Sequence, residues 1–139
     1  MHDENARFLK GNSGNAGVFS TLRDMERFVG MLANGGRTKG GVFLSENIFK
    51  KATRNYTPTL CENRGIGFKL QGGINDFIGP EFGTKAFGHT GFTGTSFAVD
   101  PDTGLYVVLL SNRVHPTREN NLFSKIRLEV HRCAKTAWH

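Results

Sequence analysis

Two apolar stretches joined by only five residues limit the folds open to this chain most strongly. Residues 86–99 and 105–112 each predict a strand, and the link between them, DPDTG (100–104), predicts a turn, because proline presets φ and glycine tolerates positive φ. So short a link allows only an antiparallel pair, since parallel strands need a crossover of a dozen or more residues. The run LYVVLL (105–110) is apolar throughout, which is typical of a central strand covered on both faces.

Helical patterns flank these strands. Thr21 with Asp24 three residues later predicts an N-cap, apolar residues then recur at helical spacing through Leu32, and two glycines after Asn34 predict the helix end. Ser45 predicts the start of a second, shorter helix, and residues 122–137 carry the apolar stripe of a third. Further segments are a strand at 65–71, a packed functional loop at 72–83 and an irregular lead-in at 2–19.

The order helix, helix, strand, strand, strand, helix predicts an α+β architecture, in which an antiparallel sheet packs with helices. A length of 139 residues fits one domain or part of one. Within it we expect a helical segment over residues 20–55, and three strands plus a C-terminal helix over residues 64–139.

Composition argues against several classes of function. The net charge is +6, from 18 basic and 12 acidic residues, but the basic residues are scattered, which favours a solvated surface over nucleic-acid binding. Two cysteines, Cys61 and Cys133, are too few for a zinc site or a disulfide scaffold, so we expect no metal and no cofactor. We find no membrane span and no signal peptide, and the cellular compartment stays open.

The run GHTGFTGTS (88–96) places a histidine, small hydroxyl residues and three glycines where a core strand is expected. On a regular strand His89 and Ser96 would point to opposite faces, which disfavours a nucleophile–base pair built from this strand alone. Gly91 and Gly94 weaken a strand unless something approaches its backbone closely, as a substrate would. The alternative is a capping histidine beside a β-bulge.

This run and the following FAVDPDTGLYVVLLSNRVHPTREN (97–120) resemble the C-terminal part of the serine β-lactamase-like hydrolases, the superfamily of class C β-lactamases, penicillin-binding proteins and esterases. Residues 2–36 are similar to the segment that enters the helical region of that family. The resemblance extends over almost the whole chain. It implies that residues 1–139 are a single incomplete domain, the C-terminal portion of the β-lactamase-like (transpeptidase-like) fold.

The resemblance also implies a site. The third motif of the family corresponds to His89-Thr90-Gly91, on an edge strand that lines the active site, and the backbone N–H of Phe92 corresponds to a donor of the oxyanion hole. Thr93 and Gly94 would then help to bind substrate, and His89 would place a polar group beside the leaving group or a carboxylate. The parent activity would be hydrolysis of an ester, amide or β-lactam through an acyl-enzyme, with a small-molecule or peptide-like substrate.

The chain departs from that family in two motifs. It contains no Ser-x-x-Lys, the motif of the nucleophile, and no Tyr-x-Asn or Tyr-x-Ser. We therefore expect no catalysis by this chain alone, and whether it acts as an enzyme stays open. The alternative is a stand-alone, non-catalytic module that binds a peptide along an exposed edge strand at 86–96. We also expect a salt bridge at Arg113 and a homodimer or swapped dimer through exposed apolar surface.

Overall fold

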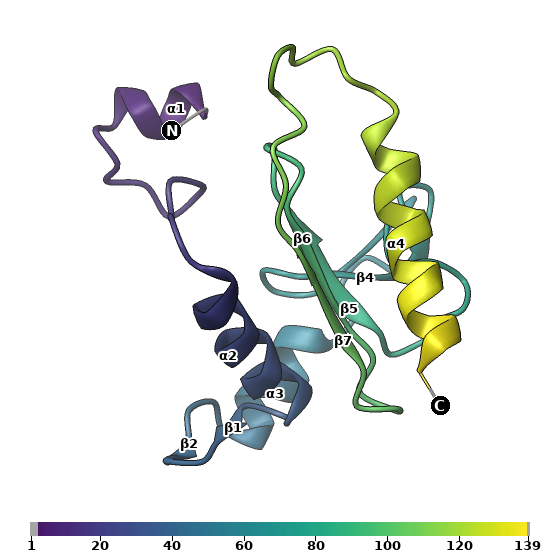
Figure 1. Ribbon diagram of the computed structural model, residues 1–139. Helices are drawn as coiled ribbons and strands as arrows, with labels where there is room; N and C mark the ends of the chain where they lie inside the picture. Colours follow the sequence, from purple (N-terminus) through teal and green to yellow (C-terminus); the bar gives the residue numbers. More distant parts are fainter. Residues whose placement is uncertain (1–2, 139) are drawn as a thin grey trace.

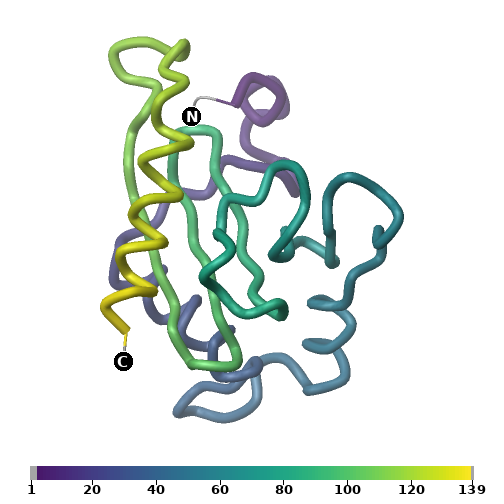
Figure 2. Tube along the Cα trace, turned by 90° about the vertical axis from the view of Figure 1, so that its right-hand side faces the viewer, coloured from purple at the N-terminus to yellow at the C-terminus, as the bar shows by residue number. Residues whose placement is uncertain are grey.

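The computed structural model, which describes residues 3–138, has one five-stranded antiparallel sheet with helices on both faces (Figure 1). The α+β architecture predicted from the sequence is therefore confirmed. Helices α2 and α3 pack on one face and α4 on the other, and α4 runs alongside the β6–β7 hairpin (Figure 2). The sheet has the order β3-β4-β5-β6-β7, with strands β3 (Glu62–Arg64), β4 (Lys69–Gly73), β5 (Phe87–Thr90), β6 (Ser96–Val99) and β7 (Tyr106–Leu109).

The three predicted helices are confirmed as α2 (Leu22–Ala33), α3 (Glu46–Thr53) and α4 (Phe123–Ala137). The Thr21 hydroxyl accepts the Asp24 N–H at 3.2 Å, and that of Ser45 accepts the Ile48 N–H at 3.4 Å, so both caps satisfy N–H groups that a helix start leaves unpaired. The prediction of an irregular lead-in is wrong at α1 (Glu4–Phe8), where the Asp3 carboxylate caps Ala6 N–H at 2.8 Å. Residues 20–55 also contain a small hairpin, β1 (Arg37–Thr38) and β2 (Gly41–Val42).

The prediction of a single strand over 86–99 is wrong. That stretch is a hairpin of β5 and β6, in which Thr90 pairs with Ser96. Its loop closes through Gly91 N–H to Thr95 C=O at 2.7 Å and Gly94 N–H to Gly91 C=O at 3.0 Å, and Gly94 has φ +103°. Positive φ is easy for glycine, so the glycine-rich run reverses the chain instead of extending it. Residues 86–96 are therefore no edge strand, because β5 and β6 are both interior to the sheet.

Two further strand predictions need correction. The strand expected at 65–71 begins at Lys69, because Gly67 has φ +77° and residues 65–68 form the turn between β3 and β4. Where three strands were expected from residue 64 onward, residues 64–138 hold four complete strands, β4 to β7, and the last residue of β3. The apolar β7 lies at the end of the described sheet and is not central. It is nevertheless covered on both faces, by α2 and by α4, which explains its continuous apolar sequence.

Each face of the sheet has its own apolar core. On the face of α2 and α3, Phe87 is fully buried and its ring contacts those of Phe49 and Phe68, with centroids 5.7 and 5.0 Å apart. On the face of α4, the loop predicted to pack at 72–83 does so through buried Phe77, Ile78 and Phe82. The two cores hold the β5–β6 hairpin from both sides, and its loop projects beyond them.

Candidate active site

The motif His89-Thr90-Gly91 lies where β5 ends. Strand β4 pairs with Phe87 and Gly88 only, so the last two residues of β5 extend past that ladder. The His89 side chain is exposed, and its Nδ1 lies 2.9 Å from the carbonyl oxygen of Thr90. The pairing of His89 with Phe97 places both on the α2 face, whereas Thr90 and Ser96 point to the α4 face. The motif therefore sits at an accessible end of an interior strand.

A cleft of about 320 Å³ lies between this end of the hairpin and the start of α4. Three of the six predicted site residues line it: Thr90, Gly91 and Phe92. The remaining three, His89, Thr93 and Gly94, are not among its lining residues. Its other walls come from the segment after β7 and the first turns of α4, through Arg113, Asn120, Asn121, Phe123, Ser124 and Arg127.

The hairpin loop presents unpaired backbone donors. In the described part of the chain, neither the Phe92 N–H nor the Thr93 N–H has a hydrogen-bond acceptor. Three successive carbonyl groups beside them are bonded, since Gly91 C=O accepts from Gly94 and those of Phe92 and Thr93 accept from Arg113. A loop whose carbonyls are held and whose N–H groups are free suits a ligand that brings hydrogen-bond acceptors.

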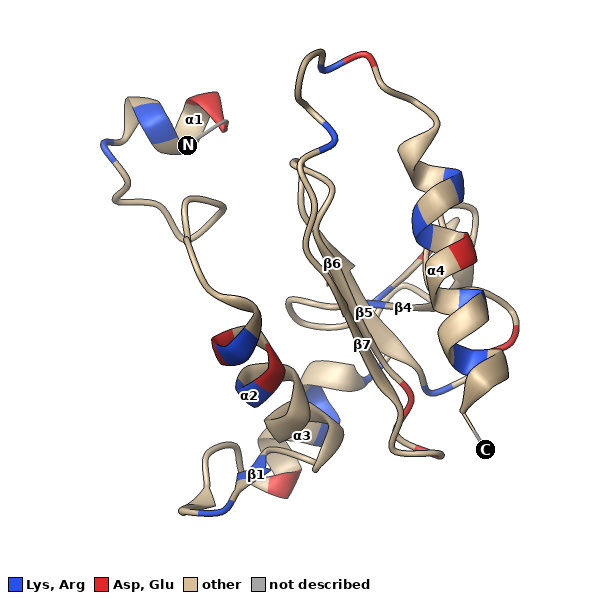
Figure 3. Cartoon of the chain, viewed as in Figure 1, with Lys and Arg blue, Asp and Glu red and all other residues tan. Residues whose placement is uncertain are grey.

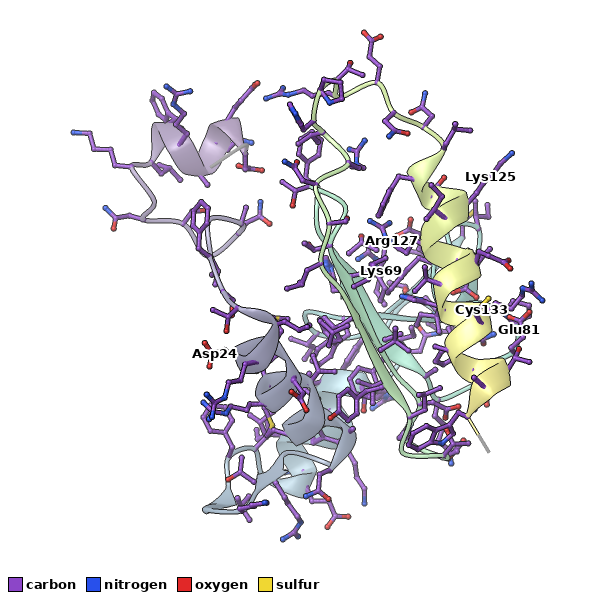
Figure 4. All side chains as sticks on the ribbon, viewed as in Figure 1. Asp24, Lys69, Glu81, Lys125, Arg127 and Cys133 are labelled. Carbon is purple, nitrogen blue, oxygen red and sulfur yellow. The ribbon has the colours of Figure 1, made fainter. Side chains whose placement is uncertain are left out.

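Two arginines give the cleft a positive character. Its lining residues include Arg113 and Arg127 and no acidic residue. Arg127 lies on the side of α4 that faces the sheet, whereas Lys125 points away (Figure 4). Burial, and to a smaller extent the charge of Arg113, lowers the pKa of the Arg127 guanidinium. Its Nε is buried and has no partner among residues 3–138. The positive charge of the two guanidinium groups favours an anionic or strongly polarised oxygen in the cleft.

The structure corrects the expected role of Arg113. No ion pair involving it occurs within residues 3–138; instead its Nε donates to the Phe92 carbonyl at 2.8 Å. Its partner is 21 residues away in sequence, so only the β6–β7 hairpin, which brings the two segments together, could have revealed the contact.

A buried serine–histidine pair was not anticipated. Ser96 Oγ lies 3.3 Å from His131 Nε2, beneath the sheet face that carries Thr90. Both side chains are buried, and burial lowers the pKa of His131 to about 4. Since a substrate cannot reach this pair, we assign it to the packing of α4 on β6.

We also searched residues 3–138 for a metal site, a basic surface and a membrane-spanning helix. Within residues 3–138, His, Cys, Asp and Glu form no group of three that could hold a metal ion, and Cys61 and Cys133 are exposed and unpaired. Lysine and arginine are interspersed with acidic residues over the helices and loops (Figure 3). The absence of nucleic-acid binding stays a prediction. In the same range, each helix is too short or too polar to cross a bilayer.

Comparison with known proteins places these features in a family context. The family model named Beta-lactamase matches residues 1–130. A putative D-alanyl-D-alanine carboxypeptidase of Salmonella typhi is 37% identical over 122 residues, which cover 83% of this chain and 27% of that protein. One from Escherichia coli K12 is 32% identical over 143 residues, covering 94% of this chain and 31% of that protein. This chain thus spans less than a third of the length of these relatives.

A solved structure has the same fold. A beta-lactamase from Mycobacterium bovis superposes with a TM-score of 0.63 at 24% identity, over 84% of this chain and 45% of that one. At that identity the likeness shows the fold alone.

Proposed function

Because this chain belongs to the beta-lactamase family of hydrolases, we propose that it forms one wall of a serine-hydrolase active site. In this proposal the loop after β5 binds the carbonyl oxygen of an ester, amide or peptide-like substrate. The observation that carries it is the free N–H of Phe92, which directly follows the His-Thr-Gly motif at the edge of the cleft. A backbone N–H of fixed direction stabilises a developing oxyanion without needing any particular side chain.

The cleft favours a substrate that carries a carboxylate. Arg113 and Arg127 supply positive charge, and Thr90 supplies a hydroxyl beside them. The relatives named as putative D-alanyl-D-alanine carboxypeptidases suggest a peptide that ends in D-alanine. We propose such a peptide as the ligand class. His89 would then meet the part of the substrate that passes across the end of β5, on the opposite face from Thr90.

We propose further that these 139 residues bind such a ligand without turning it over. The sequence lacks Ser-x-x-Lys and Tyr-x-Asn, and the serine hydroxyl that lies beside an imidazole within residues 3–138, that of Ser96, is buried. Without an activated nucleophile no acyl-enzyme forms, although the oxyanion-binding wall is present.

The test combines binding and labelling. Diacetyl-L-lysyl-D-alanyl-D-alanine is titrated while the amide resonances of Phe92 and Thr93 are followed, with the C-terminal amide of that peptide as the matched control ligand. We expect saturable shifts with the carboxylate and weaker ones with the amide. Thr90→Val should weaken binding, whereas the exposed Thr136→Val should not. A fluorescent penicillin should label no serine. Unchanged Phe92 and Thr93 resonances, or a labelled serine, would contradict the proposal.

A further inference from the structure

We propose that Arg113 is a positioning residue, which holds the hairpin loop 91–95 in the conformation that leaves the Phe92 N–H free to face a ligand. This inference rests on the proposed function for its consequence, but its structural claim concerns the loop itself. It is carried by the contacts that this one residue makes with two successive peptide groups of the loop.

Arg113 forms two hydrogen bonds with the loop. Its side-chain Nε donates to Phe92 C=O at 2.8 Å, and its backbone N–H donates to Thr93 C=O at 2.8 Å. These two carbonyls belong to the peptide groups on either side of Thr93. Since a peptide group is planar, fixing its carbonyl also fixes the N–H at its other end. Arg113 therefore sets the direction of the Thr93 N–H and of the Gly94 N–H. The Gly94 N–H in turn donates to Gly91 C=O, whose peptide group carries the Phe92 N–H.

The other end of the Arg113 guanidinium group contacts the segment that leads into α4. Its Nη1 lies 3.2 Å from the Arg118 carbonyl oxygen and 3.4 Å from that of Asn120, and the group stacks on the Phe92 ring with Cζ 4.9 Å from the centroid. One planar fork thus joins the hairpin loop to the segment that leads into α4. A lysine ammonium has neither the planar face nor the forked donors to make these contacts together.

Few other hydrogen bonds hold the hairpin loop 91–95 in place. Phe92 is 50% exposed, so its side chain does not anchor the loop in a core. Besides the bonds from Arg113, two backbone bonds close the loop, Gly91 N–H to Thr95 C=O and Gly94 N–H to Gly91 C=O, and Arg127 Nη2 lies 3.5 Å from Thr95 C=O. Gly94 is buried, and a Cβ built there would meet Ser111 Oγ and the side chain of Arg113, so the tightly packed part of the loop also rests on Arg113. The conformation of the exposed Phe92–Thr93 part therefore depends on Arg113.

The experiment measures loop order in the full chain by 15N relaxation, without any ligand. In Arg113→Gln we expect order parameters at Phe92, Thr93 and Gly94 to fall from about 0.85 to below about 0.6. The Thr93 amide proton should also shift upfield, because its peptide group loses a charged donor. Arg113→Lys should give intermediate values. Arg27→Gln removes the same charge from an exposed site on α2 and should change nothing in the loop.

A wild-type measurement keeps the inference testable if Arg113→Gln does not fold. The Nε–H of Arg113 should exchange with water at least tenfold more slowly than that of an exposed arginine. Exchange at the exposed rate would overturn the inference, as would a rigid loop in a folded Arg113→Gln, judged by unchanged Gly88 and Ala98 resonances. A loop that loosens while the wild type binds no peptide would instead sink the proposed function and leave this inference standing.

Discussion

His131 Nε2 on α4 lies 3.3 Å from Ser96 Oγ on β6, and the imidazole is fully buried against the rings of Phe77 and Phe82. Ser96 pairs with Thr90 across the hairpin, so this contact fixes α4 directly behind a residue of the cleft. Burial, together with the charge of Arg127, lowers the pKa of His131 to about 4, while Asp76 acts in the opposite direction. The neutral imidazole is therefore the form that the folded protein holds.

From this we predict acid destabilisation with a defined window. The unfolded histidine binds a proton near pH 6.5 and the folded one only near pH 4, so the unfolded state holds more protons between these values. Stability should fall as the pH drops through that window, by up to about 3 kcal/mol from this group. His131→Gln cannot titrate and should lose correspondingly less between pH 7 and pH 4.5. Urea unfolding at several pH values measures the free energy of unfolding of both proteins. An equal loss of stability with falling pH in the two proteins would contradict the prediction.

Lys135 should contribute far more to stability than Lys85, although both form an ion pair with an aspartate. Its Nζ lies 2.5 Å from Oδ2 of Asp100, whose side chain is 1% exposed and also accepts the N–H groups of Gly83 and Asp102. Burial alone would raise the pKa of Asp100, but these bonds outweigh it and lower the pKa. Removing one partner leaves a buried charge, so Lys135→Met should cost about 2–4 kcal/mol in chemical unfolding. Lys85→Met breaks an exposed pair with Asp102 and should change stability little.

Three of the four helices within residues 3–138 could be predicted from the sequence, α1 being missed, whereas two of the strand predictions were wrong. Helix caps such as Thr21 and Ser45 and the 3.6-residue spacing are local, so they survive in any tertiary setting. A glycine-rich run such as 91–94 is compatible with an approached strand and with a chain reversal, and only long-range pairing decides. The pairing of Thr90 with Ser96 shows the reversal, which divides the single predicted strand into β5 and β6.

The candidate site divides in the same way. The backbone group at Phe92 could be proposed because the His-Thr-Gly motif directly precedes it. Arg127, which gives the cleft part of its charge, lies 32 residues from the Thr95 carbonyl it approaches, and no spacing rule connects them. Ser96 and His131 are 35 residues apart and meet only because α4 folds back over the sheet. A local motif could therefore predict the hydrogen-bond donor at Phe92, whereas the charged and buried side chains around the cleft are brought together only by the tertiary fold.

Self-association is predicted from apolar side chains left at the surface. Val18, Phe19 and Phe43 are 89, 80 and 70% exposed. Large exposed apolar residues favour contact with a second molecule. We expect a dimer, simple or swapped, whose fraction rises with concentration in light scattering. The double variant Phe19→Ser and Phe43→Ser should shift the equilibrium toward monomer, with Thr136→Ser as the control. A wild type that stays monomeric over a hundredfold concentration range would contradict this prediction.

Gly88, immediately before the motif, should not tolerate even a methyl group. A Cβ built there would overlap the carbonyl oxygen of Phe97 on the paired strand, so the β5–β6 backbone would have to move. Backbone cannot rotate away as a flexible side chain can, and Gly88→Ala should therefore destabilise the protein by at least about 2–3 kcal/mol in urea unfolding. It should also disturb the Phe92 and Thr93 amide resonances, because the hairpin that carries them is displaced. Gly14→Ala places the same methyl group in open space and should leave both readouts unchanged. If Gly88→Ala proved as stable as Gly14→Ala, the close packing of β5 against β6 would be wrong.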